Sequence, residues 1–282
     1  MVQYPDTQRN PIMTPAVQKF RTSLSESRRI VIKIGSRVIV QASGKPDKRR
    51  IGRLVADITA ARKAGYEIVM VSSGAIAAGM EALGLSTRPS AVADLQMCAA
   101  VGQGRLISGY AELFGKANLL VGQVLLTHDD FTRKVNVTNL RRTMDHLLQA
   151  GVIPIINEND VVADEELKAD MSLGDNDYLA SLVVKQIRAD LLIILSTTDG
   201  LKDMSNPDHP RRIPLVETIT RETFRLVAPV KGALSKGGMD TKLKAAQTCT
   251  RDGCAVVIAN GRENNVLASI LSGKDTGTLF LP

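Results

Sequence analysis

The chain has 282 residues, of which 44% are hydrophobic and 23% are charged, ordinary values for a globular protein with a sizeable core. Its formal net charge of +7 favours anionic partners, but an aromatic content of 3% without tryptophan argues against the base-stacking surfaces of single-strand nucleic-acid binders. No apolar run is long enough to span a membrane, and three cysteines without paired spacing favour a reducing, cytoplasmic compartment. The histidines lie far apart, without a histidine or cysteine partner at zinc-like spacing, so we expect no structural metal.

The first 28 residues are polar and include Pro5, Pro11 and Pro15, so they predict a disordered tail. Short apolar runs then alternate with segments of helical period. Residues 29–40 predict the first strand. Residues 49–65 predict a helix, because apolar side chains recur every three or four positions before a glycine. Further strands are predicted at "YEIVMVSSG", "NLLVGQVLL", "GVIPIIN", "ADLLIILSTTDG" and "CAVVIANG".

Continuous apolar strands separated by helices predict the fold class: an α/β three-layer sandwich, with a central, mostly parallel sheet covered by helices on both faces. No internal repeat or clear linker interrupts residues 29–282, so we expect one domain with two lobes, 29–188 and 189–282. Sheets of this kind bind ligands beyond the carboxyl ends of their strands, so the residues that follow each strand are the candidates for function.

The first strand contains Lys33 among valines and isoleucines. A lysine there is costly unless its ammonium group reaches an anion near the strand end; the alternative is an edge lysine whose stem lies along apolar surface. Gly35 and Ser36 follow at once, and we expect their backbone N–H groups to face the same anion.

The second strand ends in "VSSGAIAAG", in which Ser73, Gly74 and Ala75 form a tight turn into a helix. Small residues let a ligand approach the backbone, and a helix N-terminus favours negative charge. Close packing of strand against helix would give a similar pattern. The chain has neither a complete dinucleotide-binding glycine motif nor a Walker loop.

A long polar loop carries a cluster at each end: "NEND" at 157–160 follows a strand, and "GDND" at 174–177 precedes a helix. Helix capping alone would explain Asp175 or Asn176, and Glu165 and Glu166 have the ordinary interpretation of solvated charge. Two such clusters around one loop, near the lysine of a neighbouring strand, instead indicate a ligand site, with the middle of the loop as its rim.

A fourth group of polar residues lies in the second half of the chain. Ser196 and Thr197 follow the strand "LLIIL", and "KGGMDTK" at 236–242 opens a later helix. A glycine pair, the hydroxyl of Thr241 and the ammonium of Lys242 at a helix start predict a second anion site.

Lys33-Ile-Gly-Ser36, "SSGAIAAG", "NEND", "LGDND", "LS..DGL" and "GGM.TKL.AA" occur in this order. Together they resemble the amino acid kinase superfamily, most closely the glutamate 5-kinases, over about 29–280. The resemblance implies transfer of the γ-phosphoryl group of ATP, with Mg²⁺, to the side-chain carboxylate of L-glutamate, the first step towards proline. It also implies a homodimer or homotetramer and proline as a feedback inhibitor, and no partner of the nucleic-acid or membrane kind. The small RNA-binding-like domain that follows the kinase in many bacterial members is expected to be absent.

The resemblance also assigns roles to residues. Lys33 and Lys242 would hold the transferring phosphoryl group, and Asp175 would orient both lysines. The acceptor amino acid would be bound by Ser73, Gly74, Ala75, Asp160 and Asn176. The nucleotide would be bound by Lys33, Gly35, Ser36, Ser196, Thr197, Lys236, Gly237, Gly238, Met239, Asp240, Thr241 and Lys242.

Two positions depart from the resembled pattern: glutamate 5-kinases often have an acid where this chain has Thr197, and a threonine where it has Lys236. Both differences concern nucleotide contacts. Two alternatives share the motifs, namely a kinase of another small carboxylate such as acetylglutamate, and a catalytically silent sensor of nucleotide or amino acid. The presence of Lys33, Asp175 and Lys242 favours an enzyme, because a sensor needs no group of residues converging on a phosphoryl group.

Overall fold

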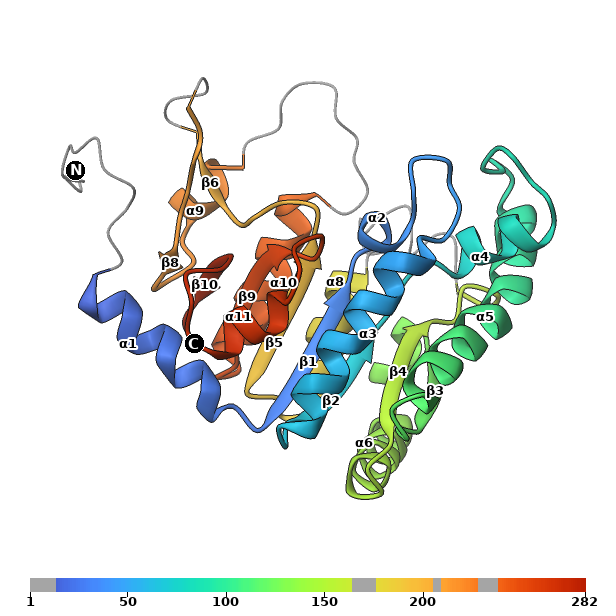
Figure 1. Ribbon diagram of the computed structural model, residues 1–282, viewed down its shortest axis with the longest axis horizontal. Coiled ribbons are helices and arrows are strands. Elements are labelled where there is room, and N and C mark those ends of the chain that lie inside the picture. Colours follow the sequence, from blue (N-terminus) through green and yellow to red (C-terminus); the bar gives the residue numbers. More distant parts are fainter. Residues whose placement is uncertain (1–13, 164–175, 205–208, 228–237) are drawn as a thin grey trace.

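The computed structural model describes residues 14–163, 176–204, 209–227 and 238–282. Its centre is an eight-stranded sheet in the order β3-β4-β2-β1-β5-β9-β10-β8 (Figure 1). Only β10 runs antiparallel to its neighbour β9 among these described strands; the other neighbouring pairs are parallel. The strands are β1 (Arg29–Ile34), β2 (Glu67–Val71), β3 (Val121–Leu126), β4 (Ile153–Glu158), β5 (Leu191–Ser196), β8 (Leu215–Val216), β9 (Ala255–Asn260) and β10 (Thr278–Phe280), and a separate hairpin joins β6 (Lys202–Asp203) to β7 (Arg211–Arg212).

Helices cover both faces of the sheet (Figure 1). One face packs against α3 (Lys48–Lys63), α5 (Val92–Gly115) and α11 (Val266–Leu271), and the other against α6 (Lys134–Gln149), α8 (Asn176–Ile187) and α10 (Met239–Arg251). Because strand side chains alternate between faces, Ile30 and Ile32 join the first hydrophobic core while Val31 joins the second. The predicted three-layer α/β architecture is therefore confirmed. The shorter helices are α2 (Ser36–Ile39), α4 (Ala75–Ala82), α9 (Arg221–Arg225) and the 3₁₀ turns η1 (Leu24–Glu26) and η2 (His128–Phe131).

The predicted strands recur in the structure, but the first is shorter than expected. β1 ends at Ile34 instead of continuing to Val40, and Gly35 caps the short helix α2. The reason is that the backbone N–H of Gly35 donates to the carbonyl oxygen of Leu195 at 2.9 Å, after which the chain leaves the sheet. The predicted helix at 49–65 is present as α3.

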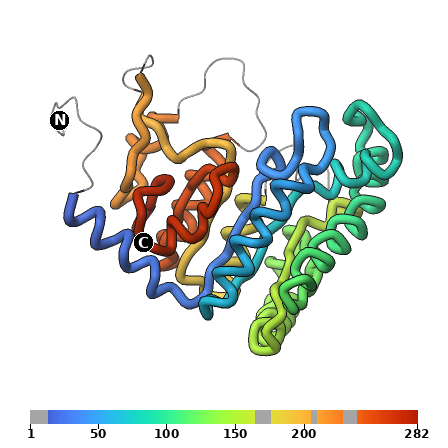
Figure 2. The backbone as a smooth tube through the Cα atoms, viewed as in Figure 1, coloured from blue at the N-terminus to red at the C-terminus, as the bar shows by residue number. Residues whose placement is uncertain are grey.

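The tail predicted to be disordered is partly helical, which corrects the sequence interpretation for residues 14–28; residues 1–13 lie outside the described part. Helix α1 (Pro15–Ser23) begins with proline at its first position, where the missing N–H costs nothing. Arg21 is fully buried and forms an ion pair with Asp275 at 3.0 Å. Its guanidinium also donates to the carbonyl oxygen of Pro214, just before β8, and to those of Lys274, Thr276 and Gly277 in the loop before β10. Figure 2 shows α1 running beside the C-terminal end of the chain. These contacts of a buried arginine tie the N-terminal helix to the domain.

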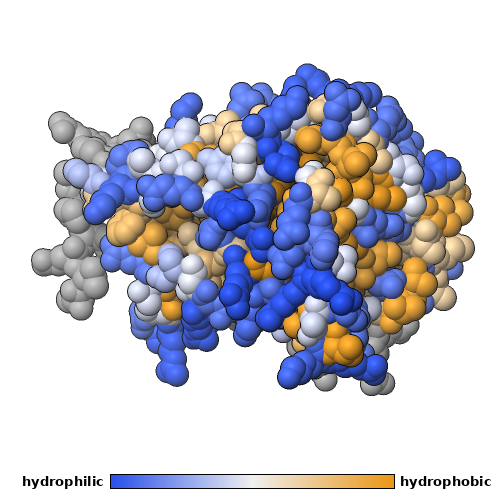
Figure 3. Space-filling model, turned by 90° about the horizontal axis from the view of Figure 1, so that it is seen from below, coloured by the Kyte–Doolittle hydropathy of each residue, from blue (hydrophilic) through white to orange (hydrophobic). Residues whose placement is uncertain are grey.

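Hydrophobic side chains gather on one side of the face at which the parallel strands begin (Figure 3). Viewed from the edge at which the parallel strands begin, hydrophilic side chains cover the left and centre, and hydrophobic ones gather towards the right, where β3, α5 and α6 lie (Figure 3). Leu120, just before β3, is 70% exposed. Among the described residues, no helix is both long and apolar enough to cross a membrane.

Candidate active site

The carboxyl ends of β1, β2, β4 and β5 lie at one edge of the sheet because these strands are parallel. From β1 the chain moves to β2 on one side, whereas β5 lies on the other side of β1. A reversal of this kind opens a crevice at the strand ends, where open α/β sheets bind ligands.

A buried carboxylate joins two lysines at this edge. Oδ1 of Asp177, on the first turn of α8, lies 2.5 Å from Nζ of Lys33 on β1, and its Oδ2 lies 2.9 Å from Nζ of Lys242 on α10. The three residues are 0%, 2% and 4% exposed, respectively. Three elements far apart in sequence thus bring their charges to one point.

The electrostatics of this triad suit an incoming anion. Among the described residues, two ammonium groups share one carboxylate in a site that water hardly reaches. The carboxylate offsets the repulsion between the lysines and fixes their positions, so little reorganisation is needed when negative charge arrives. The hydroxyl of Thr241, one residue before Lys242, lies 3.3 Å from Asp177 Oδ2 and donates to Gly238 O at 2.9 Å.

Among the described residues, the carboxylate that joins the lysines is that of Asp177. The sequence analysis gave this role to Asp175, which lies outside the described residues, so that assignment stays a prediction. The helical period of α8 could have pointed to Asp177. The buried residues Ala180, Val184 and Ile187 recur every three or four positions, and Asp177 lies one such step before Ala180. Asp177 therefore lies on the side of α8 that faces the sheet.

Asn176 connects the polar clusters that the sequence analysis placed at the two ends of the loop. Its Nδ2 donates to Ser72 O at 2.6 Å, to Ser73 Oγ at 2.9 Å and to Asn157 Oδ1 at 3.1 Å. The structure thereby brings together the ends of β2 and β4 and the start of α8. Within the described part of the chain no donor reaches the carboxamide oxygen of Asn176, so this oxygen can accept from a ligand. Asp160 follows the end of β4 and is partly exposed.

Two residues of α5 support this polar group and were missed from the sequence. Asn157, which is 2% exposed, donates through Nδ2 to Oε1 of Gln103 at 2.9 Å. The hydroxyl groups of Tyr110 and Ser72 lie 3.0 Å apart, and burial raises the pKa of Tyr110 to about 12. A glutamine and a tyrosine seven positions apart on one helix face are a detectable pattern, but only the fold shows that this face meets the ends of β2 and β4.

The small residues of "SSGAIAAG" serve helix packing. Gly74 has a φ of 97°, a left-handed conformation that favours glycine, and caps α4. A Cβ at Gly102 of α5 would lie 1.8 Å from the carbonyl oxygen of Ala75, and one at Gly79 would lie 1.8 Å from that of Cys98. The backbones of α4 and α5 are therefore in direct contact, as the packing interpretation requires. Whether Gly74 and Ala75 also contact a ligand remains a prediction.

The residues expected to bind the nucleotide differ in whether their polar groups are exposed or already bonded within the protein. The N–H of Gly35 is already bonded to Leu195 O, which corrects the expectation that it faces an anion. Ser36 and Thr197 are exposed, and Ser196 ends β5. Gly238 caps α10, Met239 packs against the second core, and Asp240 pairs with Lys244 at 2.8 Å on the exposed face of that helix. Lys236 and Gly237 lie outside the described residues.

The sequence pattern that defines the amino acid kinase family matches residues 28–260, most of the chain. The chain belongs to this family. This amino acid kinase is 44% identical to the glutamate 5-kinase of Methylococcus capsulatus over 93% of its length and 70% of the relative, and 42% identical to that of Clostridium acetobutylicum over 92% and 96%. The enzyme of the same name from Pelobacter propionicus is 42% identical over 90% of this chain and 68% of the relative.

Solved structures share the fold at low identity. Carbamate kinase from Giardia lamblia bound to AMP-PNP superposes with a TM-score of 0.63 and 18% identity, over 91% of this amino acid kinase and 99% of that chain. UMP kinase from Bacillus anthracis gives 0.58 and 15%, over 90% and 96%. The mostly parallel sheet between two helical layers is therefore that of the amino acid kinases.

Proposed function

We propose that this amino acid kinase transfers the γ-phosphoryl group of ATP to the side-chain carboxylate of L-glutamate, giving glutamyl 5-phosphate and ADP, the first step of proline biosynthesis. The observation that carries the proposal is the buried carboxylate of Asp177 between the ammonium groups of Lys33 and Lys242. Relatives named glutamate 5-kinase, more than 40% identical over nine tenths of the chain, support the choice of acceptor.

The reaction needs charge stabilisation more than proton transfer. A glutamate side chain has a pKa of about 4.3 and is ionised at neutral pH, so no general base has to act on it. The obstacle is the approach of one anion to another that is more highly charged. Lys33 from the sheet and Lys242 from α10 would contact the transferring phosphoryl group and offset this repulsion. Asp177 would keep the two ammonium groups in position before and after transfer.

The acceptor would lie on the side of β2 and β4, within residues 29–188. The carboxamide oxygen of Asn176 would accept from the ammonium group of glutamate, since its amide nitrogen is already bonded to three protein oxygens. Ser73, which follows β2 and accepts from this amide nitrogen, and Asp160, which follows β4, would complete the acceptor site. The nucleotide would lie beyond β5 and the start of α10, within 189–282.

Magnesium fits this site as an ion carried by ATP. In the described ranges no three carboxylate, histidine or cysteine side chains come together as metal ligands, and both oxygens of Asp177 face lysines. Mg²⁺ commonly keeps several waters and binds through substrate phosphates, where it neutralises phosphate charge.

The remaining partners follow from the same assignment. Exposed apolar side chains around β3 and α5, including Met97, Val101 and Leu125, support a homo-oligomer formed through that side. Proline, which resembles glutamate in its α-carboxylate and amine, would act at or beside the acceptor site.

Hydroxylamine trapping tests the proposal directly, because hydroxylamine converts an acyl phosphate into a hydroxamate. With glutamate, ATP and Mg²⁺, the full chain should form a glutamyl hydroxamate, and acetylglutamate and aspartate should give much less product and less ADP. Lys242→Met should lower the rate by about two orders of magnitude or more. Lys244→Met, two positions after Lys242 on the exposed face of α10, is the matched control and should keep the rate. Hydroxamate from acetylglutamate alone would move the assignment to a related kinase, and no acceptor-dependent ADP release would favour a silent sensor.

A further inference from the structure

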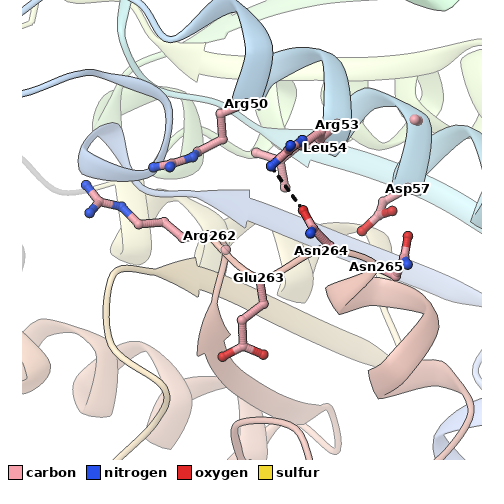
Figure 4. Close-up of a pocket in the computed structure, with 10 residues that line it drawn as sticks. Arg50, Arg53, Leu54, Asp57, Arg262, Glu263, Asn264 and Asn265 are labelled. Atoms are coloured by element: carbon pink, nitrogen blue, oxygen red, sulfur yellow. Dashed lines mark hydrogen bonds between the residues drawn. The ribbon is translucent and has the colours of Figure 1, made fainter.

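A cleft of about 330 Å³ lies between the first half of α3 and the loop that joins β9 to α11, and neither Lys33 nor Lys242 lines it. Figure 4 shows Arg50 and Arg53 extending from α3, and Arg262 from the loop, around this opening. None of these residues belongs to the acceptor or nucleotide positions described above.

A glycine positions the loop that carries Arg262. A Cβ at Gly261 would lie 2.9 Å from both Leu195 Cβ and Val38 Cγ1, so only glycine allows the loop to press against the end of β5 and against α2. The N–H of Gly261 donates to Ser196 O at 2.8 Å. The next residue, Arg262, is thereby placed beside α2, where its Nη2 donates to Arg37 O at 2.9 Å.

The other two arginines are held as well. Arg53 Nη1 donates to Asn264 Oδ1 at 3.1 Å, and Arg50 Nη1 lies 3.5 Å from Val38 O. A guanidinium has five N–H donors, so each arginine keeps donors for a ligand after making these contacts. The neutral anchors fix the three side chains without neutralising them.

Nearby carboxylates do not neutralise this cluster either. The side chain of Glu263 points away from the three guanidinium groups (Figure 4). The carboxylate of Asp57 accepts from the backbone N–H groups of Val266 and Leu267, and burial raises its pKa. Among the described residues the nearest ion-pair contact of the three arginines is Arg50 Nε to Asp47 Oδ2, at 3.9 Å. Three cations around one opening repel one another, which an anion between them would relieve.

We propose that this cleft binds a phosphate group, either as inorganic phosphate or as part of a small phosphorylated metabolite such as a nucleoside monophosphate. Guanidinium groups match phosphate through paired N–H···O bonds, and arginines on two elements can contact it from two sides. The cleft is larger than one phosphate ion, so there is room for an attached organic group. The inference does not depend on which carboxylate the kinase phosphorylates.

Calorimetric titration of the full chain with inorganic phosphate tests the site, with AMP titrated in a parallel experiment. The variants are Arg53→Gln and Arg262→Gln in the cleft and Lys242→Met in the catalytic site. Arg49→Gln is the matched control, because Arg49 is an exposed neighbour on α3 that does not line the cleft. Loss of one charged, paired contact should weaken binding about tenfold in each cleft variant. Arg49→Gln should bind like the wild type, and Lys242→Met should keep the cleft binding event.

The outcomes separate the cleft from the catalytic site. Tighter binding of AMP than of phosphate would identify a phosphorylated metabolite as the ligand, and equal binding would identify the phosphate group alone. Phosphate binding that disappears in Lys242→Met but persists in Arg53→Gln would overturn the proposal, because the lysines would then account for all of it. So would the absence of binding by the wild type up to about 10 mM, or an equal loss in Arg49→Gln, which would indicate unspecific attraction to a basic surface.

Discussion

Replacing Asp177 with asparagine removes the negative charge between the two buried lysines while keeping the size of the side chain. Asp177 lies 2.5 Å from Lys33 Nζ and 2.9 Å from Lys242 Nζ. With an effective dielectric constant of about 20, each contact corresponds to a gross attraction of about 6 kcal/mol. The cost of burying the charges offsets much of this attraction, so losing the partner should lower the free energy of unfolding by about 3–5 kcal/mol.

The same change should also impair turnover. Without the carboxylate, the two ammonium groups repel each other and no longer hold fixed positions around the phosphoryl group, so we expect kcat to fall by about 10²–10³. The melting temperature should fall by about 10 °C, given the stability loss and the length of the chain. Hydroxamate formation measures the first effect, and urea unfolding with a thermal melt measures the second.

Asp145→Asn is the matched control. Asp145 pairs with Arg29 at 3.2 Å, but its side chain is 49% exposed, so losing it should cost no more than about 1 kcal/mol and leave turnover unchanged. If Asp177→Asn kept turnover within about threefold of the wild type, the carboxylate would not be what aligns the lysines. An unfolding free energy equal to that of Asp145→Asn would show that the buried triad does not contribute as calculated.

Three further predictions concern α5. Gly102→Ala should destabilise the protein by about 3 kcal/mol because the new Cβ meets backbone, whereas Gly104→Ala, with open space, should stabilise it by about 0.5–1 kcal/mol in urea unfolding. Gln103→Leu leaves the buried amide of Asn157 without its acceptor and should raise KM for glutamate about tenfold with less change in kcat, while Gln103→Glu keeps the acceptor and should stay near wild type. The pKa of Tyr110 rises from its usual 10.0 to about 12 in the fold. Above about pH 10 the unfolded state therefore loses the proton first, stability should fall by up to about 1.4 kcal/mol per pH unit until about pH 12, and Tyr110→Phe should flatten this part of the profile.

The layered architecture was predictable because it rests on local patterns. Apolar runs of β-branched residues between segments of helical period specify parallel strands and covering helices without reference to partners. The first strand was drawn too long because nothing local distinguishes the run after Gly35 from a strand, and its end depends on a hydrogen bond to Leu195, about 160 positions away. The N-terminal helix was missed for the same reason: the carbonyl groups that bury Arg21 come from the other end of the chain.

By itself, the sequence determined that a lysine sits in a buried strand, that polar clusters follow two strand ends and precede a helix, and which family these motifs resemble. The tertiary structure decided that Asp177 meets the lysines, since the rotation of α8 against β1 and α10 places it between Lys33 and Lys242. It also decided that α5 supports the acceptor side through Gln103, and that arginines from α3 and from the loop after β9 surround one cleft. These relations join residues distant in sequence, and an ion pair or hydrogen bond depends on separations of a few ångströms that only packing fixes.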